Sequence, residues 1–508
     1  MFLAAVIRNS YYRRIVSGLI ESKYLVEAVQ TVKCGVSHPA VFSNRPTQPL
    51  MHTLEQLQNG SLAGTVRLQL SCGLTEFPQE IFELADTLEI LDLSGNALST
   101  LPDELPRLTR LRVIFCSANQ FTVLPAILGA CQQLTMIGFK SNRISEVPAA
   151  ALPAALRWLI LTDNRIAALP AAIGRCAQLQ KLMLAGNQLS DLPKELAACT
   201  ELELLRIAAN ELTTLPAWLL GMPRLAWLAY AGNAFSAADE MAATPGANPV
   251  GIAWNRLRME HGLGEGASGV IYQAVLGEAR QDGDEHAPPG ARAVAVKLFK
   301  GAITSDGLPR CELAACISAG SHPNLIPVLG EVIDHPDGVH GCVMTLIGPE
   351  FHSLAGPPSL ESCTRDIYPS GKSFSLETVL RLARGIASAA RHLHSRGVMH
   401  GDLYAHNILH TSEGDTLLGD FGAASPLAGH GPQADALQRL EVRAFGLLLG
   451  ELIERCDNHA TSAAVLASLA QLQSACVQTS PAARPLFDEI ARRMANDSGE
   501  LAGFDRSA

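Results

Sequence analysis

Three polar residues in the C-terminal half of the chain have types and spacing suited to phosphate chemistry. Asp402 lies in the run His400-Gly-Asp-Leu-Tyr-Ala-His-Asn407, so an asparagine follows it at the fifth position. A second aspartate, Asp420, precedes Phe-Gly, which is typical of a tight turn. This set can provide a base and two metal ligands around a triphosphate.

A glycine-rich segment and a strand ending in lysine precede these residues. Gly264-x-Gly266-x-x-Gly269, followed by Ile271, fits a hairpin whose glycines let backbone amides approach phosphates. Dinucleotide-binding folds use the same glycine spacing, but no acidic residue follows a second strand here. Val294-Ala-Val-Lys297 predicts a strand that ends in a lysine, a cation suited to binding phosphates.

These segments, in this order, resemble a protein kinase over residues 254–497. The resemblance implies a bilobal fold that binds ATP and Mg²⁺. It implies that Asp402 accepts or orients the substrate proton and that Asn407 and Asp420 bind Mg²⁺. Glu312, in a run that reads as helix, is the expected partner of Lys297.

The ATP site implied by the resemblance combines the glycine-rich hairpin, the lysine and the last strand before the hinge. Met344 is a candidate guard of the adenine pocket, or equally an ordinary core methionine. The residues expected to bind ATP are Leu263, Gly264, Gly266, Ser268, Gly269, Ile271, Lys297 and Met344.

The catalytic run also departs from the kinase pattern. Gly401 replaces the arginine that pairs with a phosphorylated activation loop, so switching by loop phosphorylation is not expected. Tyr404 stands where serine/threonine kinases carry lysine, and His406 where tyrosine kinases carry arginine. Residues 423–440 are too short for the usual substrate platform and lack Ala-Pro-Glu, which removes the usual partner of Arg484.

Downstream of this segment, Glu441–Glu451 resembles the long buried helix of the kinase C-lobe. Glu441 replaces the aspartate usual at the start of that helix, so the resemblance implies that the helix begins there.

Three functions are compatible with these motifs. The first is an ATP-dependent protein kinase that phosphorylates serine or threonine, and the set Lys297, Glu312, Asp402, Asn407 and Asp420 favours it. The His-Gly-Asp run also resembles aminoglycoside- and choline-kinase-like enzymes, so a small-molecule phosphotransferase is the second. The third is a nucleotide-binding pseudokinase scaffold whose working part is the N-terminal half.

Asparagines recur at a spacing of 22 or 23 residues through that half. Around each lies L-x-x-L-x-L-x-x-N-x-L-x-x-L-P or a close variant, which resembles leucine-rich repeats. One unit cannot bury its apolar face alone, so the units are expected to stack into a horseshoe-shaped solenoid. Each asparagine amide can satisfy backbone groups at the turn. The asparagines are Asn96, Asn119, Asn142, Asn164, Asn187, Asn210 and Asn233.

Strand positions between the core leucines should line the concave face of this solenoid. Most are apolar, which is unusual for a solvated face, so we expect a surface that binds a protein and thereby recruits substrates or uncovers the kinase. The alternative is that the C-terminal domain covers the face. The predicted partner-binding residues are Val113, Phe115, Met136, Trp158, Ile160, Met183, Leu204 and Trp227.

The predicted organisation is an extension at 1–50, α/β repeats at 51–242, a linker at 243–253, an α+β kinase domain at 254–497 and a tail at 498–508. The extension is either a weakly ordered arm or an upstream start that is rarely used, because it does not follow the repeat pattern.

Composition narrows the environment and the partners. The net charge of −10 argues against nucleic acid and anionic membranes as partners. No apolar run reaches the roughly 18–20 residues that span a bilayer. The 12 cysteines include no C-x-x-C pair, so we expect reduced thiols in a cytoplasmic protein.

Overall fold

The computed structural model describes residues 51–242, 250–266, 268–278, 291–301, 303–427, 431–457 and 463–504. The predicted extension at 1–50, most of the predicted linker and the last residues of the predicted tail lie outside these segments. The chain from Met51 onward groups as one unit, so the predicted boundary between repeats and kinase stays a prediction.

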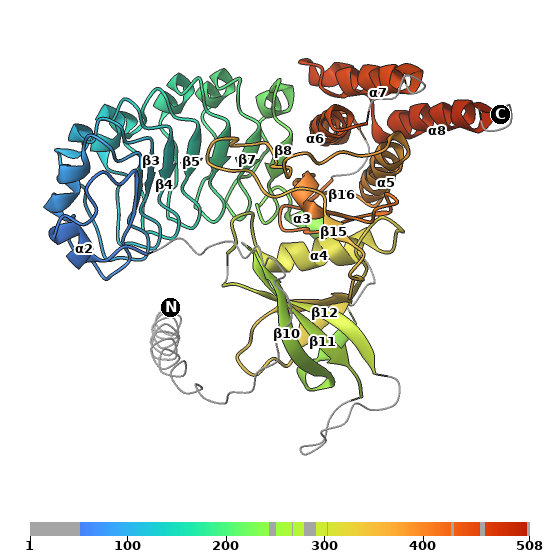
Figure 1. Cartoon of the computed structure of the whole chain (residues 1–508), viewed down its shortest axis with the longest axis horizontal. Helices are drawn as coiled ribbons and strands as arrows, with labels where there is room; N and C mark the ends of the chain where they lie inside the picture. The colour runs from blue at the N-terminus through green and yellow to red at the C-terminus, as the bar shows by residue number, and fades with distance from the viewer. Residues whose placement is uncertain are drawn as a thin grey trace, which may run out of the picture. The chain divides into compact units, whose positions relative to one another are not determined.

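The repeats stack into one parallel sheet in which each unit contributes a strand of three residues (Figure 1). The middle residue of each strand, such as Leu182, is fully buried in the solenoid core. The register aligns Lys181 with Leu204 and Met183 with Arg206, so equivalent positions of successive strands form columns along one face of the sheet. The strands are β1 (Arg67–Gln69), β2 (Ile90–Asp92), β3 (Val113–Phe115), β4 (Met136–Gly138), β5 (Trp158–Ile160), β6 (Lys181–Met183), β7 (Leu204–Arg206) and β8 (Trp227–Ala229).

Helical turns complete the units. The α-helices at the two ends of the repeats are α2 (Leu54–Gln58) and α3 (Ala237–Ala242). The 3-10 helices between strands are η2 (Gln79–Leu84), η3 (Leu105–Arg107), η4 (Ala126–Ala130), η5 (Ala149–Ala151), η6 (Ala171–Arg175), η7 (Lys194–Ala198) and η8 (Ala217–Gly221).

A ladder of asparagines joins successive repeats. Oδ1 of Asn187 accepts from the Ile166 amide at 3.0 Å, and Nδ2 donates to the Leu161 and Leu184 carbonyls at 2.9 Å. Asn210 repeats this arrangement one unit later. The predicted role of the asparagine amide is confirmed, because it satisfies buried backbone groups in two adjacent units.

The first lobe of the C-terminal half is a six-stranded sheet with one long helix beside it (Figure 1). The strand order is β10-β11-β12-β14-β13-β9. The elements are β9 (Gly251–Ala253), η9 (Trp254–Arg256), β10 (Leu257–Glu265), β11 (Gly269–Leu276), β12 (Arg292–Phe299), α4 (Pro309–Ala319), β13 (Val328–Ile333) and β14 (Gly341–Thr345).

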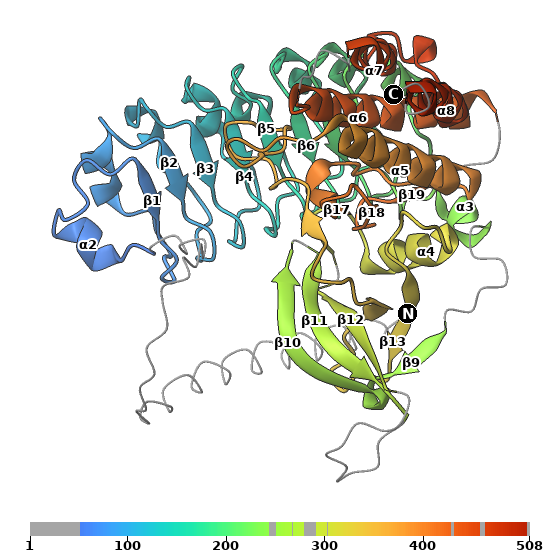
Figure 2. The same cartoon turned by 45° about the vertical axis from the view of Figure 1, so that its right-hand side comes forward.

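The second lobe is mainly helical (Figure 2). Ser375 caps its central helix by accepting a hydrogen bond from the Thr378 amide. None of the helices in the described segments is long and apolar enough to cross a bilayer. The elements are β15 (His352–Ser353), α5 (Leu376–Ser395), β16 (Val398–Met399), η10 (Ala405–Asn407), β17 (Ile408–His410), β18 (Thr416–Leu418), β19 (Ser425–Pro426), α6 (Pro432–Glu454), α7 (Ala463–Cys476), η12 (Pro481–Ala483) and α8 (Phe487–Phe504).

The start of α6 differs from the expectation. The sequence suggested that the long helix begins at Glu441, whereas α6 begins at Pro432. Proline at the first helical turn is favourable because its missing N–H needs no partner there. The added turns pack Leu437 and Leu440 against the apolar core of the repeats. The repeats therefore support a segment that in the family pattern would belong to the substrate platform.

Arg484 has found other partners in place of its usual glutamate. It donates to the carbonyls of Gln478 and Arg439, and at 2.7 Å to the carbonyl of Pro223 in the repeats. This buried arginine thus joins the second lobe to the repeat array.

Candidate active site

A buried lysine joins the sheet of the first lobe to the helix beside it. Nζ of Lys297, on β12, lies 2.5 Å from Oε1 of Glu312 on α4 and 3.2 Å from Oδ1 of Asp420. Burial alone would lower the pKa of Lys297, but Asp420 and Glu312 raise it above its ordinary value. The lysine is therefore charged and held where β12, α4 and the Asp-Phe-Gly turn meet.

Glu312 and Asp420 respond differently to this environment. Burial raises the pKa of Glu312 to about 7, although the Lys297 ammonium opposes the shift. Burial would also raise the pKa of Asp420, but Lys297 and the Gly422 amide keep it below its ordinary value. Near neutral pH Asp420 is an anion, whereas Glu312 titrates.

The catalytic run is held by a second set of hydrogen bonds. Asn407 Nδ2 donates to both the carbonyl and Oδ2 of Asp402, each at 2.9 Å. The Gly401 amide donates at 2.7 Å to Glu441, which also contacts His394. The Asn407 carbonyl accepts from the Gly419 amide at 3.0 Å, which links this set to the turn that carries Asp420.

The glycine-rich hairpin joins β10 to β11. A Cβ atom at Gly264 or Gly266 would meet no other atom within 4 Å, so the backbone is open there. At Gly269 a Cβ would lie 2.5 Å from the Leu298 carbonyl, because β11 passes close to β12. Leu263 is 46% exposed, whereas Ser268 is buried.

Two further residues of the predicted ATP site lie on the sheet. Ile271 is in register with Lys297, on the neighbouring strand. Met344 is in register with Ala295 and packs against the core that contains Phe299. Their contact with ATP stays a prediction, as do the ligand roles of the hairpin residues.

The oxygens around Asp420 suit Mg²⁺. The Asp420 side chain is 48% exposed, and its charge is retained at neutral pH. Asn407 uses its amide nitrogen on Asp402, and its amide oxygen is the atom suited to a metal. In the described segments no three His, Cys, Asp or Glu side chains group to hold a metal by themselves. Mg²⁺ is commonly held by one or two protein ligands and substrate phosphates, so these residues fit the ion.

The predicted partner surface needs a correction at its C-terminal end. Trp227 is only 2% exposed: its Nε1 donates to the Leu403 carbonyl at 3.1 Å, and its ring stacks on Tyr404 with centroids 4.1 Å apart. Leu204 is also buried and Met183 packs beside it, both in the core of the second lobe. The kinase-like half covers these residues, and removing their apolar surface from water lowers the free energy of the folded chain.

The N-terminal part of the surface is only partly enclosed. Val113 and Met136 are buried, whereas Phe115, Trp158 and Ile160 are half-buried. The Lys181 ammonium lies 4.4 Å above the Trp158 ring. Their role in binding a partner stays a prediction.

Arg206 is the residue that the sequence analysis missed. On β7 it occupies the position that corresponds to the apolar residues Ile160 on β5 and Met183 on β6. Its side chain is only 2% exposed and forms ion pairs with Asp306 and Asp402. Asp306 lies in a Gly/Pro-containing run, which by itself indicates only a turn. The sequence does carry a signal for this contact: an arginine on a strand face whose other positions are mostly apolar indicates a specific acidic partner.

Comparison with known proteins agrees with this architecture. Residues 257–443 match the family "Protein tyrosine and serine/threonine kinase", and residues 87–108 match the family "Leucine Rich Repeat". The fold is thus a repeat solenoid followed by a kinase fold. The chain is a leucine-rich-repeat protein with a protein kinase domain.

Individual relatives match only part of the chain. Fibroblast growth factor receptor 1 of Pleurodeles waltl is 31% identical over 34% of this chain and 21% of its own length. Leucine-rich repeat and calponin homology domain-containing protein 1 of Mus musculus is 31% identical over 26% of this chain and 19% of its own length. The chain therefore spans about a fifth of these relatives.

Two other similarities have different coverage. Putative cyclin-dependent kinase F-2 of Oryza sativa subsp. japonica is 28% identical over 37% of this chain and 53% of its own length. A solved LRR protein of Leptospira interrogans is 29% identical with a TM-score of 0.28, covering 33% of this chain and 49% of that one.

Proposed function

We propose that this protein is an ATP-dependent protein kinase that transfers the γ-phosphoryl group to serine or threonine hydroxyls of partner proteins. The observation that carries the proposal is the Lys297–Glu312–Asp420 network beside the Asp402–Asn407 pair. A buried cation flanked by carboxylates, next to a carboxylate held for proton transfer, is suited to phosphoryl transfer by positioning and electrostatics.

In the proposed reaction Lys297 binds the α- and β-phosphates, and Glu312 keeps its ammonium in place. Asp420 and Asn407 would hold Mg²⁺, which offsets the charge of the phosphates when bound. Asp402 orients the acceptor hydroxyl and takes its proton as the new oxygen–phosphorus bond forms. The bond between the γ-phosphorus and the bridging oxygen breaks, ADP leaves, and the proton passes to solvent.

The acceptor and the partner are the finer parts of the proposal. The matching family covers both serine/threonine and tyrosine kinases, so phosphotyrosine is the competing result. We propose that partner proteins bind near Phe115, Trp158 and Ile160. Their incomplete burial supports this role, as does their place on a leucine-rich-repeat face.

The test is incubation of the full chain with γ-labelled ATP, Mg²⁺ and a cell extract, with Asp402→Asn as control. Label on serine or threonine of an extract protein, absent with the variant, supports the proposal. Label on a small alcohol or amine would favour the small-molecule phosphotransferase, and nucleotide binding without transfer would favour a scaffold.

The partner site is tested separately with Trp158→Glu. Fewer recovered extract proteins, with unchanged transfer to a generic substrate, would support binding through the repeats. Equal recovery of every protein would contradict it.

A further inference from the structure

Arg206, at the end of β7, makes contacts that the proposed reaction does not use. Nε donates to Oδ1 of Asp306 at 2.6 Å, Nη1 donates to the Gly401 carbonyl at 3.1 Å, and Nη2 donates to Oδ1 of Asp402. A guanidinium is planar and its donors are fixed relative to one another. One side chain of the repeats therefore holds the proposed base and the backbone beside it in a single geometry.

The carboxylate of Asp402 is thus held from both sides. Oδ2 is held by Asn407 from within the kinase domain, and Oδ1 by Arg206 from the repeats. The side chains at the two loop positions where the family carries cations contact other residues instead of Asp402. Tyr404 is stacked beneath Trp227, and His406 Nδ1 lies 2.8 Å from Asp366. Among the described residues, the ion pair that reaches Asp402 comes from Arg206.

Gly401 explains how the repeats can come so close. Its φ is +73°, a conformation that favours glycine, and a Cβ there would lie 2.5 Å from the Ala423 carbonyl and 2.7 Å from the Leu228 carbonyl on β8. A side chain at position 401 would push β8 away from the catalytic run. Glycine at position 401 therefore permits the close approach of the repeats that carry Arg206.

The same arginine also reaches the loop before α4. Its partner Asp306 lies next to Gly307, whose amide donates to Thr304 Oγ1 at 3.2 Å. The next residue, Leu308, lies close to Gly232 of the repeats: a Cβ built on Gly232 would lie 2.9 Å from Cδ1 of Leu308. Since α4 carries Glu312, the guanidinium supports both the base and the helix that orients Lys297.

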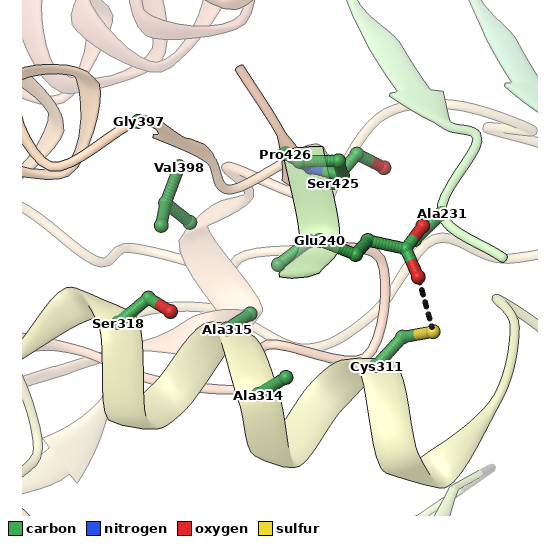
Figure 3. Close-up of a pocket in the computed structure, with 11 residues that line it drawn as sticks. Ala231, Glu240, Cys311, Ala314, Ala315, Ser318, Gly397, Val398, Ser425 and Pro426 are labelled. Atoms are coloured by element: carbon green, nitrogen blue, oxygen red, sulfur yellow. Dashed lines mark hydrogen bonds between the residues drawn. The ribbon is translucent and has the colours of Figure 1, made fainter. Parts of the chain in front are cut away.

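A second contact from the repeats meets α4 on another side. Cys311 points toward Glu240, and Sγ lies 3.7 Å from Oε2 (Figure 3). The cavity that they line has a volume of about 30 Å³, which accommodates a water molecule but not a nucleotide. It is therefore a joint between α4 and the end of the repeats, not a ligand site.

We propose that Arg206 is a positioning residue for phosphoryl transfer, and that the repeat array supplies to Asp402 the cation that the kinase domain's own loop lacks. This inference rests on the proposed function. It assigns the repeats a part in turnover itself, in addition to any capture of partners.

The opposite interpretation is that Arg206 blocks the base and keeps the kinase inactive until the repeats move. The two interpretations predict opposite changes in turnover when the guanidinium is removed. A positioning role predicts a loss of turnover, whereas a blocking role predicts a gain.

The experiment compares the full-length wild type with Arg206→Ala, Arg206→Lys and Lys140→Ala. Lys140 is a matched control because its ammonium crosses from the repeats to Ser305 at 3.3 Å, on the same loop as Asp306. Transfer from γ-labelled ATP with Mg²⁺ to the chain itself and to myelin basic protein is measured. The kcat and the KM for ATP are obtained below each variant's unfolding temperature.

We expect Arg206→Ala to lower kcat about 100-fold, as misplacement of a catalytic group does, with little change in the KM for ATP. Arg206→Lys should recover part of the loss because it keeps the charge but not the fork. Lys140→Ala should match the wild type. A kcat for Arg206→Ala equal to or above that of the wild type overturns the inference.

Failure of the inference can be told apart from failure of the proposed function. A wild type that transfers no phosphate removes both, whereas an active wild type matched by Arg206→Ala removes the inference alone. If Arg206→Ala does not fold, Arg206→Lys decides: turnover below wild type supports positioning, and turnover at or above it contradicts positioning.

Discussion

Two buried cations in this protein each lie between two carboxylates. Lys297 is held by Glu312 and Asp420, while Arg206 is held by Asp306 and Asp402. The first group lies wholly within the kinase domain. The second begins in the repeats and ends at the catalytic run. The contrast shows that one ion-pair network is local to the kinase domain and the other depends on the repeats; under our proposal the second completes the catalytic site.

The physical logic of both groups is the same. Burial alone would lower the pKa of either cation, and the paired carboxylates raise it. Removing one partner of a buried pair commonly costs about 3–5 kcal/mol, because an uncompensated charge stays behind. These cations therefore hold their elements together as well as serving the site.

The largest expected effect is at Asp402, the proposed base. Asp402→Asn keeps the shape of the side chain but removes its charge, so kcat should fall about 10²–10⁴-fold, the range for loss of general base catalysis. Steady-state transfer from labelled ATP measures this. The control is nucleotide binding, which should persist because Asp402 does not contact Lys297. Turnover near that of wild type would exclude Asp402 as the base.

The next effect tests the interface beneath Arg206. Trp227→Ala removes the stack on Tyr404 and the bond to Leu403, and should lower stability by about 3–5 kcal/mol, as for other buried tryptophans. The shift of the denaturant unfolding midpoint measures it. Trp158→Ala, at a half-buried site of the same column, should shift it less. Equal shifts would indicate that the Trp227 contact adds nothing.

A smaller effect concerns pH and the Lys297 group. Because the pKa of Glu312 is about 7, this carboxyl gains a proton as pH falls through that value and loses its charge opposite Lys297. Turnover should decline about tenfold per pH unit below about 7, as a single titrating group requires. Asp420 and Asp306 also face Glu312 and contribute to its raised pKa. The pH profile of kcat for wild type and Glu312→Gln measures this, and the variant should lose this limb of the profile.

The smallest effect comes from an exposed pair. Arg381 and Glu377 lie 2.7 Å apart on α5, one helical turn from each other, with side chains 47% and 73% exposed. Arg381→Ala should cost about 0.3–0.5 kcal/mol, the usual value for such pairs. Thermal unfolding in low and high salt measures it. A loss of stability as large as that of Trp227→Ala would mean that burial does not determine how much each contact contributes to stability.

The repeats and the Lys297 group were predictable from the sequence. The repeats show a local period, and the motifs of the Lys297 group occur along the chain in the order that the family requires. The asparagine period set the register of the strands, and the helix-forming run around Glu312 placed its carboxylate on α4. The Arg206 group joins residues 100 and 196 positions apart in sequence. No periodicity connects these residues, so the sequence could not reveal the ion pairs of Arg206. It predicted an apolar face on the repeats but not which segment covers that face.

The start of α6 illustrates the same limit. Sequence reasoning placed the start at Glu441, where the family has an aspartate, but Pro432 begins the helix because Leu437 and Leu440 find an apolar surface on the repeats. Helix propensity could not reveal that surface, since it belongs to a distant part of the chain.

The backbone at Gly401 restricts which residue can stand at this position. Replacing this glycine with arginine would recreate the common kinase motif, yet its Cβ would collide with the Ala423 carbonyl within the kinase half and with the Leu228 carbonyl of the repeats. The common motif is therefore incompatible with this packing of the catalytic run against both halves of the protein.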